Sequence, residues 1–259
     1  QRTAAQDEAE QLRHLLACGS SAGGARPKVL TSWGDGHWIA KLGSVRDPDP
    51  GLYIALEEAG LRLAAQAGLR VPEICRQTVQ GRDILLIRRF DVTGGKGRNA
   101  LVSFRTLLGG KDPYALSYAD LAEVLARYSA DPATDLELLF RQMLVNVALR
   151  NTDDHLQNFA LLHTETGWRL SPAYDIVPNI FQPGQILQIN GKHTGIGPED
   201  LTAEGRAFGF SPGKSRQCAQ AVLEALASSW EEVFRGCRVP DSHTGALRQD
   251  IRERLLQLL

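Results

Sequence analysis

The stretch RNTDDHLQNF, residues 150–159, places two aspartates, two asparagines and a histidine within one short segment. Asp153 and Asn158 have the spacing Asp-x-x-x-x-Asn, and Asp175 follows one predicted hairpin later, in AYDIVPN. This order is typical of kinases, in which the first Asp accepts the hydroxyl proton while the Asn and the second Asp bind Mg²⁺. The stretch therefore predicts a kinase-like fold built around this loop.

Other chemistries use the same residue types. Asp153, Asp154 and His155 could ligate a metal ion, but side chains adjacent in a loop rarely converge on one ion. A Ser-His-Asp hydrolase would need a Gly-x-Ser-x-Gly turn, which the sequence lacks. A solvated turn before a hairpin would explain the two aspartates without any chemistry. Phosphoryl transfer fits best, because it needs hard oxygen ligands for Mg²⁺ and a separate carboxylate for the proton.

The residues upstream supply what a triphosphate would need. The segment GSSAGGARPK, residues 19–28, precedes a predicted strand and can present backbone N–H groups to phosphate oxygens. Lys41 lies in the apolar strand WIAKL, where a lysine is expected to meet an anion. Glu57 or Glu58 on the next predicted helix could hold Lys41 by an ion pair.

Periodicity and turn residues predict the elements around these motifs. Alternating apolar residues around the turn at 34–36 and around Gly81 predict two hairpins, separated by a helix from Leu52 to Ala67 that ends at Gly68. A third hairpin is predicted around residues 164–167. Helices are expected to follow two capping boxes, Ser117 with Asp120 and Thr134 with Glu137, and two more helices to occupy residues 214–259.

Composition narrows the class of protein. The 259 residues carry a formal net charge of −1, which gives no electrostatic reason to expect direct nucleic-acid binding. The four cysteines are far apart and form no Cys-x-x-Cys pair, as expected for reduced residues of a cytosolic protein. No run of about 18 apolar residues occurs, so no membrane span is expected. The chain begins without Met, which leaves open a natural start further upstream.

These motifs resemble the HipA-type serine/threonine kinases, which are toxins of bacterial type II toxin–antitoxin modules. RNTDDHLQNF resembles the Asn-x-Asp-x-His-x-x-Asn loop of the family, and the resemblance covers roughly residues 19–210. Many members carry Glu at the hinge position that is Arg88 here, so only a backbone contact is implied for that residue. The other matching segments are SAGGARPK (21–28), LRLAAQAGLRVPE (61–73), ILLIRRFDV (84–92), LSPAYDIVPN (170–179) and LQINGKHTGI (187–196).

The resemblance implies a role for each matching residue. Asp153 would be the catalytic base, Asn158 and Asp175 would bind Mg²⁺, and His155 would be a structural pin. Autophosphorylation of the phosphate loop is implied at Ser21, with Ser20 as the alternative. The residues implied to contact ATP are Gly23, Gly24, Ala25, Arg26, Pro27, Lys28, Lys41, Arg88, Arg89, Phe90, His155, Leu156, Gln157, Asn158, Tyr174 and Asp175.

The expected architecture is an α+β, two-lobed, protein-kinase-like fold. It comprises an N-terminal arm (1–18), a small lobe with the phosphate loop and Lys41 (19–92) and a mostly helical lobe (93–259). Members of the longer type have a small N-terminal β-subdomain, of which this chain shows at most the last piece. We therefore expect either a short-form member or a fragment.

The expected activity is ATP- and Mg²⁺-dependent phosphorylation of a protein serine or threonine in the cytoplasm. The resemblance implies that the substrate is an aminoacyl-tRNA synthetase or another translation protein. It also implies a small DNA-binding, HipB-like antitoxin as partner, through which alone the chain would reach DNA. The alternatives are a small-molecule or lipid-headgroup kinase and a catalytically dead scaffold that binds antitoxin and DNA.

Overall fold

A four-stranded antiparallel sheet follows the predicted phosphate loop. In the computed structural model, which describes residues 27–43, 49, 51–93, 97–109, 112–179 and 183–259, its strand order is β1-β2-β4-β3. Both predicted hairpins are present, and their turns contain Gly34 and Gly81 in the left-handed region, at φ 56° and 73°. The strands are β1 (Lys28–Trp33), β2 (Gly36–Leu42), β3 (Ile74–Val79) and β4 (Arg82–Arg88).

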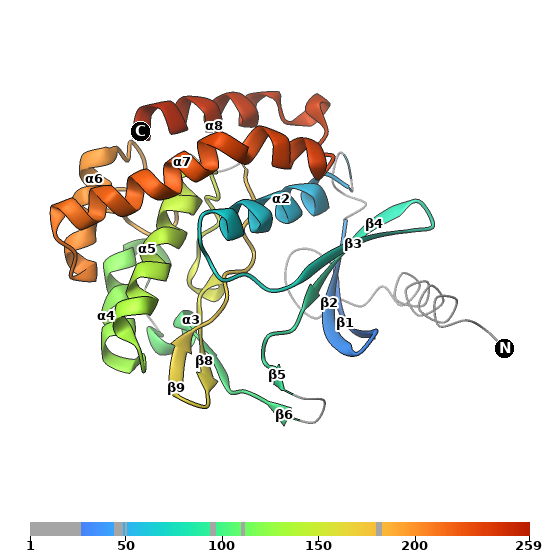
Figure 1. Ribbon diagram of the computed structural model, residues 1–259, viewed down its shortest axis with the longest axis horizontal. Helices are drawn as coiled ribbons and strands as arrows, with labels where there is room; N and C mark the ends of the chain where they lie inside the picture. The colour runs from blue at the N-terminus through green and yellow to red at the C-terminus, as the bar shows by residue number, and fades with distance from the viewer. Residues whose placement is uncertain (1–26, 44–48, 50, 94–96, 110–111, 180–182) are drawn as a thin grey trace.

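Helix α2 (Leu52–Gln66) covers one face of this sheet and was predicted within a residue. Ile54 and Leu61 of α2 pack against Leu85 and Ile87 of β4. The opposite side of α2 packs against helix α7 (Pro212–Gly236), so that α2 lies between sheet and helices (Figure 1). Because it is enclosed in this way, twelve of its fifteen residues are buried.

The second part of the chain is mostly helical and forms the main apolar core together with one side of α2. It also holds a three-stranded sheet of order β7-β8-β9, in which the predicted third hairpin is extended by β7. The three strands are β7 (Leu101–Ser103), β8 (Ala160–Thr164) and β9 (Gly167–Leu170), while β5 (Val92–Thr93) and β6 (Gly97–Arg98) form a separate two-stranded sheet. The helices are α3 (Phe104–Leu107), α4 (Tyr118–Tyr128), α5 (Pro132–Ala148), α6 (Pro198–Glu204), α7 and α8 (Gly245–Leu258), with 3₁₀ turns η1 (Pro113–Ala115), η2 (Leu156–Asn158), η3 (Gly205–Phe208) and η4 (Asp241–His243).

One of the two predicted capping boxes is confirmed and the other is wrong. Ser117 and Asp120 form the expected reciprocal pair at the start of α4. At α5 the cap is instead Asp131, whose side chain accepts a hydrogen bond from the backbone N–H of Thr134 at 3.2 Å. Pro132 occupies the first helical position, where its missing N–H is not needed, and this moves the helix start two residues ahead of the predicted cap, Thr134.

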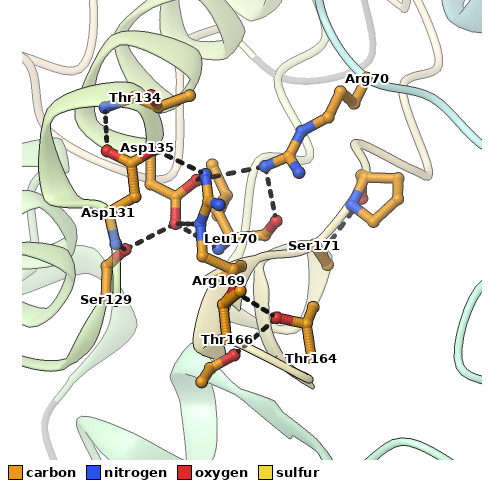
Figure 2. Close-up of polar contacts among 12 residues, drawn as sticks. Arg70, Ser129, Asp131, Thr134, Asp135, Thr164, Thr166, Arg169, Leu170 and Ser171 are labelled. Carbon is orange, nitrogen blue, oxygen red and sulfur yellow. Dashed lines mark hydrogen bonds and ion pairs between the residues drawn. The ribbon is translucent and has the colours of Figure 1, made fainter.

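A fully buried carboxylate, Asp135, joins α5 to the segment after α2 and to β9 (Figure 2). It accepts hydrogen bonds from Arg70 (3.1 Å), from both guanidinium nitrogens of Arg169 that face it (3.0 Å each) and from the hydroxyl of Ser129 (2.7 Å). The backbone N–H of Leu170 donates a further bond at 2.8 Å. A buried charge needs such partners, so this cluster fixes how the two parts of the chain meet.

Three of the four cysteines lie in the described part of the chain. Cys218 and Cys237 are buried and Cys75 is half-buried, all three as free thiols. None of the helices within the described ranges combines the length and apolarity needed to cross a membrane. The predicted arm 1–18, Cys18 and the loop residues Ser20, Ser21 and Gly23 to Arg26 lie outside the described residues.

Candidate active site

A cavity of about 500 Å³ lies where the first sheet, α2 and the stretch 150–159 meet. Its walls combine the two lysines of β1 and β2 with the acidic and amide side chains of the later loops. These charges are arranged around one space, although their positions in the sequence are far apart. The lining residues are Pro27, Lys28, Lys41, Leu42, Tyr53, Ile54, Glu57, Asp153, His155, Gln157, Asn158, Tyr174, Asp175 and Val177.

The loop that carries Asp153 begins with a sharp turn at the end of α5. Arg150 adopts a left-handed conformation (φ 60°), and its carbonyl accepts a hydrogen bond from the N–H of Asn179 at 3.1 Å. The Asp153 side chain is 59% exposed at the cavity. The amide nitrogen of Asn158 donates to the Asp153 carbonyl at 2.8 Å, which leaves the Asn158 amide oxygen for another partner.

Asp154, the adjacent carboxylate, is completely buried on the other side of the loop. It accepts hydrogen bonds from the Tyr118 hydroxyl (2.8 Å), the Gln185 side-chain amide (3.1 Å) and the Ile186 N–H (2.7 Å). Burial raises the pKa of Asp154 to about 6, against the opposing effect of these hydrogen bonds. Asp154 therefore ties the loop to the segment around Ile186, while Asp153 alone of the two reaches the cavity.

Lys41 stands between two carboxylates at the centre of the site. Its ammonium group contacts Glu57 of α2 and, at 2.5 Å, an oxygen of Asp175. Burial alone would lower the pKa of Lys41, but the charges of Glu57 and Asp175 outweigh it and raise the pKa. At Asp175 burial alone would raise the pKa, but the charge of Lys41 outweighs it and lowers the pKa. Lys41 and Asp175 are therefore both ionised at neutral pH.

The structure also decides between the two candidate partners of Lys41. Glu57 faces the cavity, whereas Glu58 points away and pairs with Arg62 at 2.8 Å and Arg76 at 3.5 Å. Burial raises the pKa of Glu57, and the neighbouring charge of Lys41 counteracts this. The sequence could not separate these adjacent glutamates, because the choice depends on the rotation of α2 about its axis.

Asp175 is held by the residues on either side of it. Its backbone is left-handed (φ 58°), a conformation that aspartate tolerates better than most residues. The Tyr174 hydroxyl donates to the Gln157 carbonyl at 2.8 Å, and the Tyr174 ring lies 5.9 Å from that of Phe90. The segment is thereby attached both to the loop carrying Asn158 and to the end of the first sheet.

His155 lies beside Asp153, with its Nε2 3.8 Å from a carboxylate oxygen of Asp153. The other ring nitrogen, Nδ1, is buried and has no hydrogen-bond partner among the described residues. The predicted contact residue Leu156 is 2% exposed and belongs to the apolar core, not to the cavity wall. His155 and Gln157 therefore face the cavity, while Leu156 anchors the loop between them.

None of the predicted hinge residues Arg88, Arg89 and Phe90 lines the first cavity, and Phe90 is linked to it through its ring contact with Tyr174. The N–H of Arg88 donates to the Glu73 carbonyl and the N–H of Arg89 to the His37 carbonyl, both at 2.8 Å. Neither N–H group is therefore available to a ligand. The predicted backbone contact with ATP could be made only by the carbonyl groups of Arg88 and Arg89 or by Phe90. Arg89 lines a second cavity of about 430 Å³, with Leu30, Thr31, Ser32, His37, Trp38, Val92, Gly97 and Arg98.

Four residues of the first cavity were not identified from the sequence. Tyr53 and Ile54 come from α2, while Leu42 and Val177 follow Lys41 and Asp175 along the chain. Tyr53 stands four residues before Glu57, so helical spacing could have indicated it. The other three are apolar residues with no distinguishing sequence signal.

The residues that could hold Mg²⁺ are one amide and one carboxylate. In the described part of the chain, no group of three or more His, Cys, Asp or Glu side chains is arranged to hold a metal. Asn158 offers its amide oxygen and Asp175 an ionised carboxylate at the same cavity. Such a sparse set of hard oxygen donors suits Mg²⁺ that also binds substrate phosphates.

The fold matches a known structure over almost the whole chain. The HipA protein of Shewanella oneidensis MR-1, solved with HipB and its operator DNA, superposes with a TM-score of 0.75 and 18% identity, covering 96% of this chain and 70% of that one. This match confirms the expected α+β fold. The sequence profile of the HipA-like C-terminal domain matches residues 20–230, so the chain belongs to that family.

Relatives of the chain carry the names of kinases and of a toxin. The Sinorhizobium fredii protein named "Putative kinase Y4mE" is 32% identical in an alignment of 133 positions, which covers 48% of this chain and 32% of that protein. The protein named Toxin YjjJ of Escherichia coli is 22% identical in an alignment of 256 positions, which covers 93% of this chain and 53% of that protein. The matches therefore span about a third and about half of these two relatives.

Proposed function

We propose that this chain is an ATP- and Mg²⁺-dependent serine/threonine protein kinase that acts as a toxin of a toxin–antitoxin module. The observation that carries the proposal is the chain of contacts from Glu57 through Lys41 to Asp175, at a cavity that also contains Asp153 and Asn158. An ionised lysine held between two carboxylates beside a separate, exposed carboxylate is the arrangement that phosphoryl transfer uses.

In this proposal each side chain has one task. Lys41, kept in place by Glu57, contacts the phosphates of ATP, and Lys28 adds positive charge at the same wall. Asn158 and Asp175 hold Mg²⁺, which when bound neutralises phosphate charge and aligns the triphosphate. Asp175 would then bind the metal in place of Lys41, while Lys41 would keep its contact with Glu57.

Asp153 is the proposed catalytic base. It accepts the proton of the acceptor serine or threonine hydroxyl as the hydroxyl oxygen bonds to the γ-phosphorus and the bond from that phosphorus to ADP breaks. Its exposure at the cavity lets it reach a substrate that comes from solvent. The buried position of Asp154 makes it unsuitable for the same role.

The biological setting is proposed from the relatives. One is named a toxin, and the structurally similar HipA was solved together with HipB and operator DNA. We therefore propose a small, HipB-like antitoxin as the partner, cytoplasmic action and an aminoacyl-tRNA synthetase or another translation protein as substrate. We further propose autophosphorylation at Ser21 or Ser20 and a division into lobes at residues 19–92 and 93–259.

Phosphoproteomics of a bacterial extract would test this function. The extract is incubated with the purified chain, Mg²⁺ and ATP labelled at the γ-position, and phosphopeptides are identified by mass spectrometry. The proposal predicts label on serine or threonine of a small set of proteins, and no label when EDTA removes Mg²⁺. Label that appears only on metabolites or lipids would contradict a protein kinase and favour the small-molecule alternative.

A further inference from the structure

Gly60, in the middle of α2, lies against the backbone of Ile176, the residue that follows the proposed metal ligand Asp175. Gly60 lies in a buried helix, where glycine is about 1 kcal/mol less favourable than alanine, so its presence needs a reason. A Cβ atom placed on Gly60 would lie 2.1 Å from the carbonyl oxygen of Ile176 and 3.0 Å from the carbonyl carbon. The backbone of α2 therefore rests directly on the backbone of the residue that follows Asp175.

This contact lies on the same side of α2 as the carboxylate that holds Lys41. Glu57 precedes Gly60 by three residues, so the two are neighbours on one helix face. That face meets the Asp175 segment twice, through Glu57 and Lys41 to the Asp175 side chain and through Gly60 to the Ile176 carbonyl. The position of the Asp175 carboxylate is thus set by how closely α2 approaches.

A side chain at residue 60 would displace the segment that carries Asp175 and not α2. The helix is enclosed by the sheet on one side and by α7 on the other. Residues 171–179 have no regular secondary structure, and Asp175 already adopts a left-handed backbone. Relief of the 2.1 Å contact to an ordinary distance of 3.4–4 Å therefore requires a shift of at least about 1 Å in the segment that carries Asp175.

We propose that Gly60 is a positioning residue, whose missing side chain lets α2 rest on the Ile176 carbonyl and so sets the Asp175 carboxylate at the metal position. This inference rests on the proposed kinase function. In this role α2 would be a fixed support for the site, in contact with Ile176 whether Asp175 binds Lys41 or a metal ion. The Val177 N–H, which donates to the Asn151 side chain at 3.3 Å, transmits the same constraint to the loop with Asp153.

The variant Gly60→Ala tests the inference. We expect kcat to fall about 100-fold, as displacements of about 1 Å do in active sites. The Mg²⁺ concentration for half-maximal activity is expected to rise, while nucleotide binding measured in EDTA stays unchanged. The matched control is Gly236→Ala at the end of α7, where a Cβ meets no atom within 4 Å and activity should be that of the wild type.

A double-mutant comparison shows whether Gly60 acts through Asp175. In an Asp175→Ala background, Gly60→Ala should cause no further loss of Mg²⁺-dependent nucleotide binding. If Gly60→Ala weakened Mg²⁺-dependent nucleotide binding by the same factor in the wild-type and Asp175→Ala backgrounds, the inference would be overturned. It would also be overturned if the single variant Gly60→Ala had the kcat and the Mg²⁺ dependence of the wild type. A wild-type chain that shows no Mg²⁺-dependent transfer at all would instead contradict the proposed function itself.

A crystal structure of the wild-type chain with Mg²⁺ and a non-hydrolysable ATP analogue tests the same idea if Gly60→Ala does not fold. The inference predicts that the Cα of Gly60 still touches the Ile176 carbonyl while Asp175 has left Lys41. Separation of α2 from Ile176 in that complex would overturn it.

Discussion

Alanine in place of Asp154 should strongly destabilise the fold, whereas alanine in place of the adjacent Asp153 should leave its stability almost unchanged. The variant Asp154→Ala removes a buried acceptor and leaves the Tyr118 hydroxyl and the Ile186 N–H without one, at 2.8 and 2.7 Å from the lost oxygens. An unsatisfied buried donor costs about 1–3 kcal/mol, which gives a loss of roughly 2–6 kcal/mol for two. Gln185 adds less, because its amide also donates to the Asn151 carbonyl at 3.0 Å.

The loss should depend on pH in a defined direction. Burial raises the folded-state pKa of Asp154 from 3.8 to about 6, so between these values the folded protein retains a proton that the unfolded chain releases. The stability that this proton contributes is present below pH 4 and disappears as the pH rises through about 6. The difference in unfolding free energy between wild type and Asp154→Ala should therefore be larger at pH 5 than at pH 7.5, by about 1.4 kcal/mol.

Urea unfolding followed by circular dichroism at both pH values measures these differences. The control is Asp153→Ala, whose exposed side chain should change the unfolding free energy by less than about 0.5 kcal/mol. Equal losses for the two variants would refute the division of roles between Asp153 and Asp154. A difference for Asp154→Ala that grows from pH 5 to pH 7.5 would refute the assigned pKa.

Two further substitutions test other parts of the account. Lys41→Met leaves Glu57 and Asp175 without their shared cation and should lower kcat/KM for ATP about 100-fold or more in a steady-state assay; a change below threefold would exclude a phosphate-binding role. Ser117→Ala removes the α4 cap, which accepts from the Asp120 N–H at 3.3 Å, and should lower the unfolding free energy by about 1 kcal/mol with kcat unchanged, whereas unaltered stability would show that the cap contributes nothing.

The elements that depend on local sequence were predicted well. The two hairpins of the first sheet follow from alternating apolar residues and from glycines at left-handed turn positions. Helix α2 follows from its apolar residues and from Gly68, which has φ 84° just beyond its end. The start of α5 was misplaced because Asp131-Pro132 and Thr134 both offer start signals, and the proline prevails.

What could not be predicted depends on how distant elements meet. Strand β7 is three residues long and forms only by pairing with β8, about sixty residues away. The choice between Glu57 and Glu58 requires the orientation of α2, and the contact of Gly60 with Ile176 joins residues over a hundred positions apart. A sequence pattern can identify such residues as candidates, but only the fold decides which of them meet.

The motif from which the kinase-like fold was inferred likewise does not specify which of its residues are buried. Its spacing predicts a role for Asp153 but contains no information about Asp154, which occupies a variable position of the motif. The structure supplies the missing distinction by burying Asp154 among hydrogen-bond donors and exposing Asp153 at the cavity. The roles of these residues in phosphoryl transfer stay predictions until the variants are measured.

Asp153→Asn tests the central claim most directly. The phosphoryl-transfer rate and the affinity for Mg²⁺ and ATP are measured side by side for this variant and for the wild type. Since Asp153 is proposed to take the hydroxyl proton without binding the metal, transfer should fall at least about 100-fold while nucleotide affinity stays within about twofold. Full transfer activity in Asp153→Asn, or a loss of nucleotide binding that accounts for the lost activity, would contradict the account.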